Sequence, residues 1–471
     1  MAFARILRSS ALLGGAQVIS LGTGFIRAKL IAVLVGPAGV GLVGILTSFN
    51  ANLSSLAGWG LGTTAVRTIS SADELDRPAK IAAVRKLGNS LTWLGLLAAL
   101  LLFWPVGQLT FNSSEYALEL FFAGLAVPCF VATSVWSSLL QANGQIKSLA
   151  RVQIISAFGG LILGLPFIWL FGVTGIAASI LIAAIVPAIA TWKAVRNYCS
   201  SHSAQADSGD IRTLLQLGAA IMAVAFLGQL SAYIVRLMLI RSHGLESAGY
   251  YQAAFVIAGS LPGFVFTAMG TDFFPRVAAV KTEAEAQDLC EKQIQAGLLL
   301  ALPLIAGLLT LGQFCIYLLY ARSFDPAIPL LPWMIWGVFF RLLSWPMGFW
   351  LIARGSSLAV VIVTAATNTS AILFPVVMLL LYGVTGAAIG FFFSCIGSTV
   401  IILVVSRRRS GRWLSVPTLR WFVLAAVALG LSQLLVARLN GPYWGLIPTT
   451  IISILCGWIY YHTLRREKSP Q

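Results

Sequence analysis

The chain has 471 residues, of which 58% are hydrophobic and only 10% are charged, and its mean hydropathy is +0.89. A soluble domain carries about 25% charged residues, so this composition excludes a soluble protein and predicts a polytopic membrane protein. The net charge of +16 could indicate nucleic-acid binding, but the positions of the basic residues favour a positive-inside bias instead.

A helix needs about twenty apolar residues to cross the hydrocarbon region of a bilayer. The first apolar run is too long for the core of a cleavable signal peptide, so we expect it to stay in the membrane as a signal anchor. We predict an all-α polytopic protein with about fourteen transmembrane helices. In chain order the predicted spans are 9–34, 42–68, 86–104, 116–140, 149–171, 174–193, 213–240, 247–274, 293–320, 327–352, 357–381, 384–405, 417–437 and 445–463.

Lysine and arginine in the loops set the predicted orientation. With the N-terminus in the cytoplasm, the inner loops and span ends collect nearly all basic residues, including the run RRRSGRW at 407–413. The outer side keeps only Arg241, Arg322 and Arg438. A bias of about eight to one predicts that both termini are cytoplasmic.

The sequence carries no pattern of catalytic chemistry. Its six cysteines include no CxxC pair, its three histidines lack ligand spacing, and no Walker A motif is present. We therefore predict no catalytic residues, no metal site and no cofactor. The outer loops are at most about a dozen residues long by this span assignment, which also disfavours an enzyme.

The chain also repeats itself with an offset of about 210 residues. Six spans, an even number, separate the copies, so both copies share one orientation. We predict two lobes related by a two-fold axis along the membrane normal, as in parallel-repeat transporters. The matching segments are GPAGVG (36–41) with GLESAG (244–249), GTTAVR (62–67) with GTDFFPR (270–276), QANGQIKSLARVQI (141–154) with IARGSSLAVVIV (352–363), and GVTGIAA (172–178) with GVTGAAI (383–389).

This duplication predicts the domain organisation. Residues 1–197 and 213–406 form two six-helix lobes around a central cavity. The polar, serine-rich segment 198–212 is the cytoplasmic linker between them. Residues 407–471 supply a basic cytoplasmic loop, two further spans and the tail.

Four basic residues lie inside predicted spans: Arg27, Lys29, Arg236 and Arg341. Each costs about 2.5–3.5 kcal/mol near a helix centre in lipid, so we expect them to face a wet cavity or a partner. Arg27 and Arg236 are related by the repeat. Two such arginines across a cavity suit a multi-oxygen anion, because guanidinium binds phosphate in a bidentate manner. Snorkelling to the outer surface is the alternative for all but Arg341, which lies too deep.

The other acids lie in loops or near span ends, and Asp272 lies in the last turn of the predicted span 247–274. It precedes Arg276 by four residues, and the repeat places it opposite Thr64, with Arg276 opposite Arg67. Asp272 and Arg276 either form an ion pair at a helix end or act in coupling or gating together with Arg67. A cation exporter normally needs a carboxylate in its cavity, so this predominantly basic set predicts an anionic substrate.

Three segments carry a resemblance to a known family: LIAVLVGPAGVGLVG (30–44), AGYYQAAF (248–255) with AMGTDFFPR (268–276), and PLLPWMIWGVFFRLLSWPMGFWLIARG (329–355). They resemble bacterial O-antigen and related lipid-linked oligosaccharide flippases. Those proteins form the polysaccharide transporter family of the multidrug/oligosaccharidyl-lipid/polysaccharide (MOP) superfamily. The resemblance extends over roughly residues 1–406.

The resemblance implies transport of an oligosaccharide on undecaprenyl diphosphate from the inner to the outer leaflet of the bacterial inner membrane, by alternating access. It implies that Arg27, Lys29, Arg236 and Arg341 hold the diphosphate, while the polyprenyl tail stays in membrane lipid. It also implies a coupling ion, H⁺ or Na⁺, with Asp272 as a candidate residue. The polymerase and chain-length machinery of the same pathway are implied as partners.

The two spans after residue 412 depart from the usual twelve. They are similar to the fourteen-span plan of the lipid II flippase branch, whose extra pair forms a groove for the lipid tail. No motif distinguishes that role from simple stabilisation. A lipid II flippase and a multidrug cation antiporter of the same superfamily remain the alternative functions, and the antiporter would need an acid in the cavity.

Overall fold

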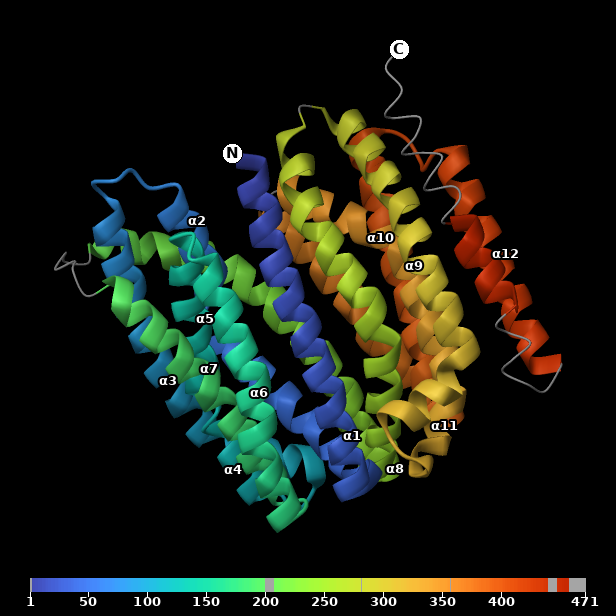
Figure 1. The fold of residues 1–471 in the computed structure, drawn as a ribbon, viewed down its shortest axis with the longest axis horizontal. Coiled ribbons are helices and arrows are strands. Elements are labelled where there is room, and N and C mark those ends of the chain that lie inside the picture. Colours follow the sequence, from blue (N-terminus) through green and yellow to red (C-terminus); the bar gives the residue numbers. More distant parts are fainter. Residues whose placement is uncertain (1, 200–206, 281, 356, 439–446, 457–471) are drawn as a thin grey trace. The chain divides into compact units, whose positions relative to one another are not determined.

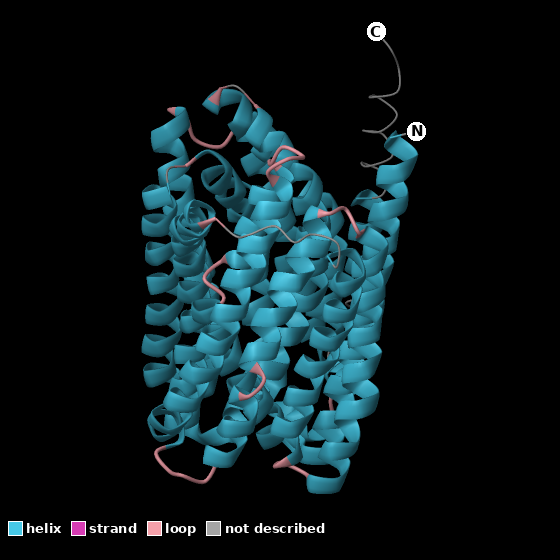
Figure 2. Ribbon diagram, turned by 90° about the vertical axis from the view of Figure 1, so that its left-hand side faces the viewer, coloured by secondary structure: helices cyan, strands magenta, loops and turns pink. Residues whose placement is uncertain are grey.

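The computed structural model describes residues 2–199, 207–280, 282–355, 357–438 and 447–456. Helices joined by short loops make up the described part of the chain (Figure 2). Two compact units are present, residues 1–249 and 250–471. The boundary falls inside one long helix, α8.

The first unit contains seven helices and the first part of an eighth (Figure 1). Many large apolar side chains on the outer faces of its helices are exposed, as expected for helices surrounded by lipid. They are α1 (Ala2–Ala57), α2 (Leu61–Ser70), α3 (Arg77–Phe111), α4 (Ala117–Gly124), α5 (Val127–Ala142), α6 (Ile146–Phe171), α7 (Gly175–Cys199) and α8 (Ser208–Ala279).

The second unit begins in the latter part of α8. Its described part continues through four α-helices, a 3₁₀ segment and a short final helix. They are α9 (Glu283–Leu319), the 3₁₀ segment η1 (Arg322–Leu330), α10 (Leu331–Arg354), α11 (Ser357–Ser410), α12 (Val416–Arg438) and the helix Ile447–Cys456.

These helices account for the predicted spans. Ten stretches in the described part of the chain are long and apolar enough to cross a membrane. Three of them, in α1, α8 and α11, each contain all or part of two predicted spans joined at one glycine. The predicted span 42–68 continues past α1 into α2, and Ile447–Cys456 covers part of the predicted span 445–463. The all-α, multi-pass prediction is therefore confirmed.

The joining glycines have a backbone conformation that other residues rarely adopt. Gly36 has φ 66° and ψ −165°, Gly244 has φ 82° and ψ 175°, and Gly383 has φ 63° and ψ −149°. This region of φ/ψ space is essentially restricted to glycine. Each glycine reverses the chain between two helices without a loop, which explains why predicted neighbouring spans merge into one long element.

The same glycines reveal the predicted repeat in the backbone. Gly36 and Gly244 are equivalent in the repeat and share one conformation, and Gly172, with φ 58° and ψ −128°, closely matches its counterpart Gly383. The hairpins that follow also match, because a Cβ on Gly175 would overlap the carbonyl oxygen of Phe167, and one on Gly386 would overlap that of Met378. Residues 167 and 378 are separated by the same 211 positions as residues 175 and 386.

One expected equivalence is absent. Gly144 has a positive φ of 66°, whereas its proposed counterpart Gly355 has φ −78° and ψ 154°. Gly355 ends α10 in an extended conformation, so the repeat is divergent at this inner turn. The predicted match of residues 141–154 with 352–363 is therefore a sequence similarity without a shared turn geometry.

The first part of α8 belongs to the first unit because it packs along the second half of α1 and the turn that follows α1. The indole Nε1 of Trp59 donates to the carbonyl oxygen of Leu215 at 2.9 Å, and Asn52 Nδ2 donates to that of Gln229 at 3.2 Å. The face of α1 that enters the core of this unit carries Leu42, Leu46, Phe49 and other residues that are at most 5% exposed: Ile45, Leu53 and Ala57. Their spacing of three and four residues is that of one helix face.

Candidate functional site

The basic residues predicted to bind substrate include three in the first unit. Arg27 is half-buried on α1, and its guanidinium Nη2 donates to Ser179 Oγ of α7 at 3.0 Å. Lys29 is half-buried two residues further along α1. Arg236 on α8 is 7% exposed, and its Nη1 donates to the carbonyl oxygen of Ala232 at 3.0 Å. The facing of Arg27 and Arg236 across a cavity stays a prediction.

Ser179 is a residue that sequence reasoning missed. It is fully buried, and the space beside it exists because α6 has a glycine there: a Cβ on Gly164 would lie 2.8 Å from Ser179 Oγ. The repeat offset of 211 places Gly390 at the position of Ser179. Glycine has no hydroxyl, so position 390 offers no equivalent of the Ser179 side chain. The sequence signal for this residue was the difference between Ser179 in the first repeat and Gly390 at the equivalent position of the second.

The remaining predicted residues lie in separate elements. Arg341 on α10 is exposed and belongs to the second unit, so its position relative to Arg27 and Arg236 stays a prediction. Arg67 is exposed in the last turn of α2, and Arg276 is exposed near the end of α8. The backbone of Asp272 is helical, but its side chain lies outside the described part of the structure. Its pairing with Arg276 therefore also stays a prediction.

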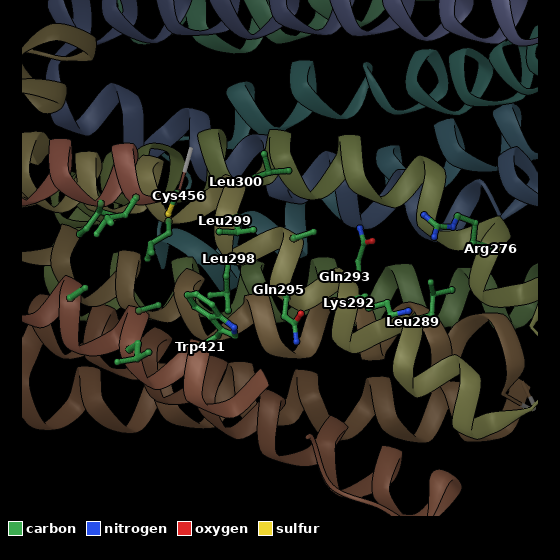
Figure 3. A pocket seen from close by; sticks show the side chains of 17 residues that line it. Arg276, Leu289, Lys292, Gln293, Gln295, Leu298, Leu299, Leu300, Trp421 and Cys456 are labelled. Atoms are coloured by element: carbon green, nitrogen blue, oxygen red, sulfur yellow. The ribbon is translucent and has the colours of Figure 1, made fainter. Parts of the chain in front are cut away.

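A groove of about 690 Å³ lies in the second unit, between α9, α12 and the helix Ile447–Cys456 (Figure 3). Arg276 at the end of α8 and Lys292 on α9 lie toward one end, and both side chains are exposed. Gln293 and Gln295 follow, and the rest of the lining is apolar. The lining residues are Arg276, Leu289, Lys292, Gln293, Gln295, Ala296, Leu298, Leu299, Leu300, Leu302, Trp421, Leu424, Ala425, Ala428, Ile452, Leu455 and Cys456.

The lining is polar toward one end and apolar over the rest, which suits an amphiphilic ligand. Two cations and two amides can bind an anionic or polar head group, and the leucines beyond them offer apolar surface to a hydrocarbon chain. The volume lies within the range typical of ligand sites, which accommodates a segment of a long lipid chain. Sequence analysis singled out neither Lys292 nor the two glutamines. The signal was the polar stretch EKQIQ (291–295) at the start of the predicted span 293–320.

A polar network fixes one wall of this groove. Glu291 on α9 is 6% exposed, and both of its carboxylate oxygens accept from the backbone N–H of Ser415, each at 3.1 Å. Thr418 Oγ1 donates to Glu291 Oε2 at 3.0 Å, and Gln295 Nε2 donates to Thr418 Oγ1 at 2.9 Å. A carboxylate at a helix start satisfies free N–H groups and interacts favourably with the helix dipole. α12 is therefore anchored on α9.

Aromatic contacts hold α12 further along its length. Phe339 of α10 stacks on Phe422 of α12 with 4.5 Å between ring centroids. Trp336 Nε1 donates to Gln433 Oε1 at 2.7 Å. The predicted thirteenth span is thus an integral part of the second unit rather than a loosely attached addition.

Comparisons with known proteins extend this picture. Residues 6–281 match the family described as polysaccharide biosynthesis protein. The lipid III flippases of Escherichia coli (strain K12) and Shigella flexneri are each 22% identical to the chain over 452 residues, which cover 86% of this chain and all of each relative.

Solved structures share the fold. The lipid II flippase MurJ, in an inward closed conformation, superimposes with a TM-score of 0.75 at 15% identity and covers 96% of this chain and 99% of its own. An inward-facing multidrug resistance MATE transporter of the MOP superfamily gives a TM-score of 0.68 at 16% identity, covering 84% and 98%. The family match spans more than half of the chain, and it bears out the resemblance drawn from the sequence. The chain belongs to the polysaccharide biosynthesis protein family and has the fold of the MOP superfamily.

Proposed function

We propose that this protein is a flippase of the bacterial inner membrane that moves an oligosaccharide linked to undecaprenyl diphosphate from the inner to the outer leaflet. Transport proceeds by alternating access, with both termini in the cytoplasm. The O-antigen repeat unit or a similar glycan is the proposed cargo. Family membership and the two lipid III flippase relatives support a lipid-linked substrate.

The observation that carries this proposal is the groove of the second unit. Arg276 and Lys292 near one end would contact phosphate, while Leu298, Leu299 and Trp421 would contact the first part of the polyprenyl chain. Both cations fall on the side that the positive-inside rule assigns to the cytoplasm, where the lipid-linked precursor would be loaded. A purely stabilising role for α12 would not require a mixed cationic and apolar groove.

Inside the membrane, Arg27, Lys29, Arg236 and Arg341 are the proposed diphosphate ligands. Guanidinium keeps its charge in apolar surroundings and binds phosphate through two parallel hydrogen bonds. Asp272, Arg276 and Arg67 are proposed to act in gating or in coupling to H⁺ or Na⁺. The glycan polymerase and the chain-length machinery of the same pathway are the proposed partners.

A transfer assay tests the proposal. Purified protein is reconstituted in liposomes with a fluorescent undecaprenyl-diphosphate oligosaccharide, and the fraction that changes leaflet is measured for the wild type and for Arg27→Gln/Arg236→Gln. We expect wild-type transfer that collapses in the double variant. Unaffected transfer in the variant would contradict the arginine clamp and leave Arg341 as the anion site.

The same assay separates the alternatives. Transfer of lipid II in preference to other undecaprenyl-linked glycans would identify a lipid II flippase, which the fold of MurJ makes the second candidate. A folded protein that transfers none of several glycans under either ion gradient, but exports cationic dyes, would instead be a multidrug antiporter.

A further inference from the structure

Two helices of the first unit cross in backbone contact at a pair of glycines. A Cβ on Gly41 of α1 would overlap the carbonyl oxygen of Leu245 on α8, and a Cβ on Gly249 of α8 would overlap that of Pro37 on α1. Both glycines are buried. Any side chain at either position would force the two helices apart, because real Cβ atoms do not approach carbonyl oxygens so closely.

This crossing is reciprocal under the internal repeat. Gly41 and Gly249 are equivalent in the repeat, with an offset of 208 residues, and Pro37 and Leu245 are equivalent by the same offset. Gly41 contacts Leu245, the counterpart of Pro37, and Gly249 contacts Pro37, the counterpart of Leu245. A contact in which i touches j and j touches i is the signature of a two-fold axis. A local two-fold axis therefore relates residues 37–41 to residues 245–249 at this crossing, within the first unit.

The crossing also lies at one defined end of the helices. It follows directly after Gly36 in α1 and Gly244 in α8, the two glycines that reverse the chain between predicted spans. Lysine and arginine place these turns on the outer side of the membrane. The contact itself is van der Waals packing between backbone atoms, in which each pair of atoms contributes little. It can therefore separate without exposing a buried charge.

We propose that the Gly41–Gly249 crossing is the outer gate of the transporter and that this structure shows it closed. The proposal rests on the alternating-access function above, since a transporter that opens outward must part its two repeats at this end. Glycine at both positions lets the backbones seal the outer end. Opening the gate separates α1 from α8 at the axis.

Distance measurements on the protein itself test the gate without any substrate. Spin labels are attached at Ser113→Cys and Ser323→Cys, two exposed residues in predicted outer loops, in an otherwise cysteine-free chain. The distance distribution is measured for Gly41→Ala and Gly249→Ala. We expect both substitutions to shift the main population of label pairs to longer distances, because the added methyl group prevents closure of the gate. Alanine favours a helix more than glycine does, so a weakened helix would not explain such a shift.

Matched controls lie on the same two helices. Gly24 on α1 and Gly228 on α8 have open space where a Cβ would be added, so Gly24→Ala and Gly228→Ala should leave the distances unchanged. Unchanged distances in folded Gly41→Ala and Gly249→Ala, or equal shifts in the controls, would overturn the gate and leave a fixed helix contact.

A second measurement keeps the proposal testable if the alanine variants do not fold. Cysteines at Pro37 and Leu245 are bridged by a short reducible bis-thiosulfonate reagent, and lipid transfer is measured before and after reduction. A gate predicts that cross-linking stops transfer and that reduction restores it; cross-linked protein that transfers at the unlinked rate would refute it. Absence of transfer in the unlinked wild type would count against the flippase function alone, and the distance measurement would still decide the gate.

Discussion

At the scale of single residues, Arg27 is held by a hydrogen bond to a neighbouring helix. Arg27 reaches across to a neighbouring helix and donates to the buried hydroxyl of Ser179, whereas Arg236 donates to the carbonyl of Ala232 within its own helix. A hydrogen bond to a second helix fixes the direction of a guanidinium more strictly than one within its own turn. If Arg27 binds diphosphate, this hydrogen bond sets its orientation before the substrate arrives.

Ser179→Ala should therefore weaken substrate binding without unfolding the protein. A hydrogen bond to a charged group contributes about 1.5–3 kcal/mol, so we expect the half-saturating lipid concentration to rise roughly 10-fold or more. Ser179→Thr should restore most of the affinity because it keeps the hydroxyl. Transfer kinetics in liposomes at several substrate concentrations measure this effect.

The control for this prediction is Ser156→Ala. Ser156 lies on α6 in the same unit, and its hydroxyl donates only to the carbonyl of Val152 in its own helix at 2.7 Å. An equal loss of affinity in both variants would mean that Ser179 acts through general packing and does not position Arg27.

At the scale of secondary-structure elements, the start of α12 depends on one buried carboxylate. Glu291 accepts four hydrogen bonds, from Gln287 Nε2, from Thr418 Oγ1 and, through both oxygens, from the N–H of Ser415. Gln287 also donates to the carbonyl oxygen of Trp413 at 2.9 Å. A charge that is buried in this way is stable only because its hydrogen-bonding capacity is filled.

Glu291→Gln should destabilise the second unit. The amide has a single oxygen, so its NH₂ group would face donors that now bind the carboxylate, at a cost of about 1–3 kcal/mol. The expected result is a lower unfolding temperature in detergent, together with faster proteolysis between α11 and α12.

The neighbouring acid provides the comparison. Asp288 pairs with Arg412, but both side chains are largely exposed, at 59% and 45%. Exposed pairs contribute about 0–1 kcal/mol, so Asp288→Asn should change the unfolding temperature little. If Asp288→Asn destabilised the protein as much as Glu291→Gln, the inner loop rather than the buried network would anchor α12.

At the scale of the whole molecule, the second unit combines a fixed wall with an open groove. α12 is held by the Glu291 network and by Phe339 and Trp336, yet it still leaves a lined space beside α9. A core would close such a space, because empty apolar volume forfeits packing contacts. A groove that stays open beside anchored helices is the behaviour expected of a binding surface for lipid.

Filling the groove should block transport while preserving the fold. Ala428 lines the groove, so Ala428→Phe should place a ring where the polyprenyl chain would lie. We expect transfer of undecaprenyl-linked glycans to fall by at least roughly 10-fold, the effect of about 1.4 kcal/mol, with an unchanged unfolding temperature. Val427→Phe is the control, since Val427 is 54% exposed and lies outside the groove lining. Normal transfer by Ala428→Phe would exclude the groove as a lipid site.

The sequence by itself determined the membrane class, the approximate spans and the repeat, because these depend on local composition and on short glycine motifs. Gly36, Gly244 and Gly383 were readable as turns for that reason. The groove around Arg276 and Lys292 and the bond from Arg27 to Ser179 were not readable. They join residues separated by up to 180 positions, and every apolar helix offers several equivalent faces to its neighbours. Only helix packing selects the face, so only the tertiary structure decided which polar groups meet.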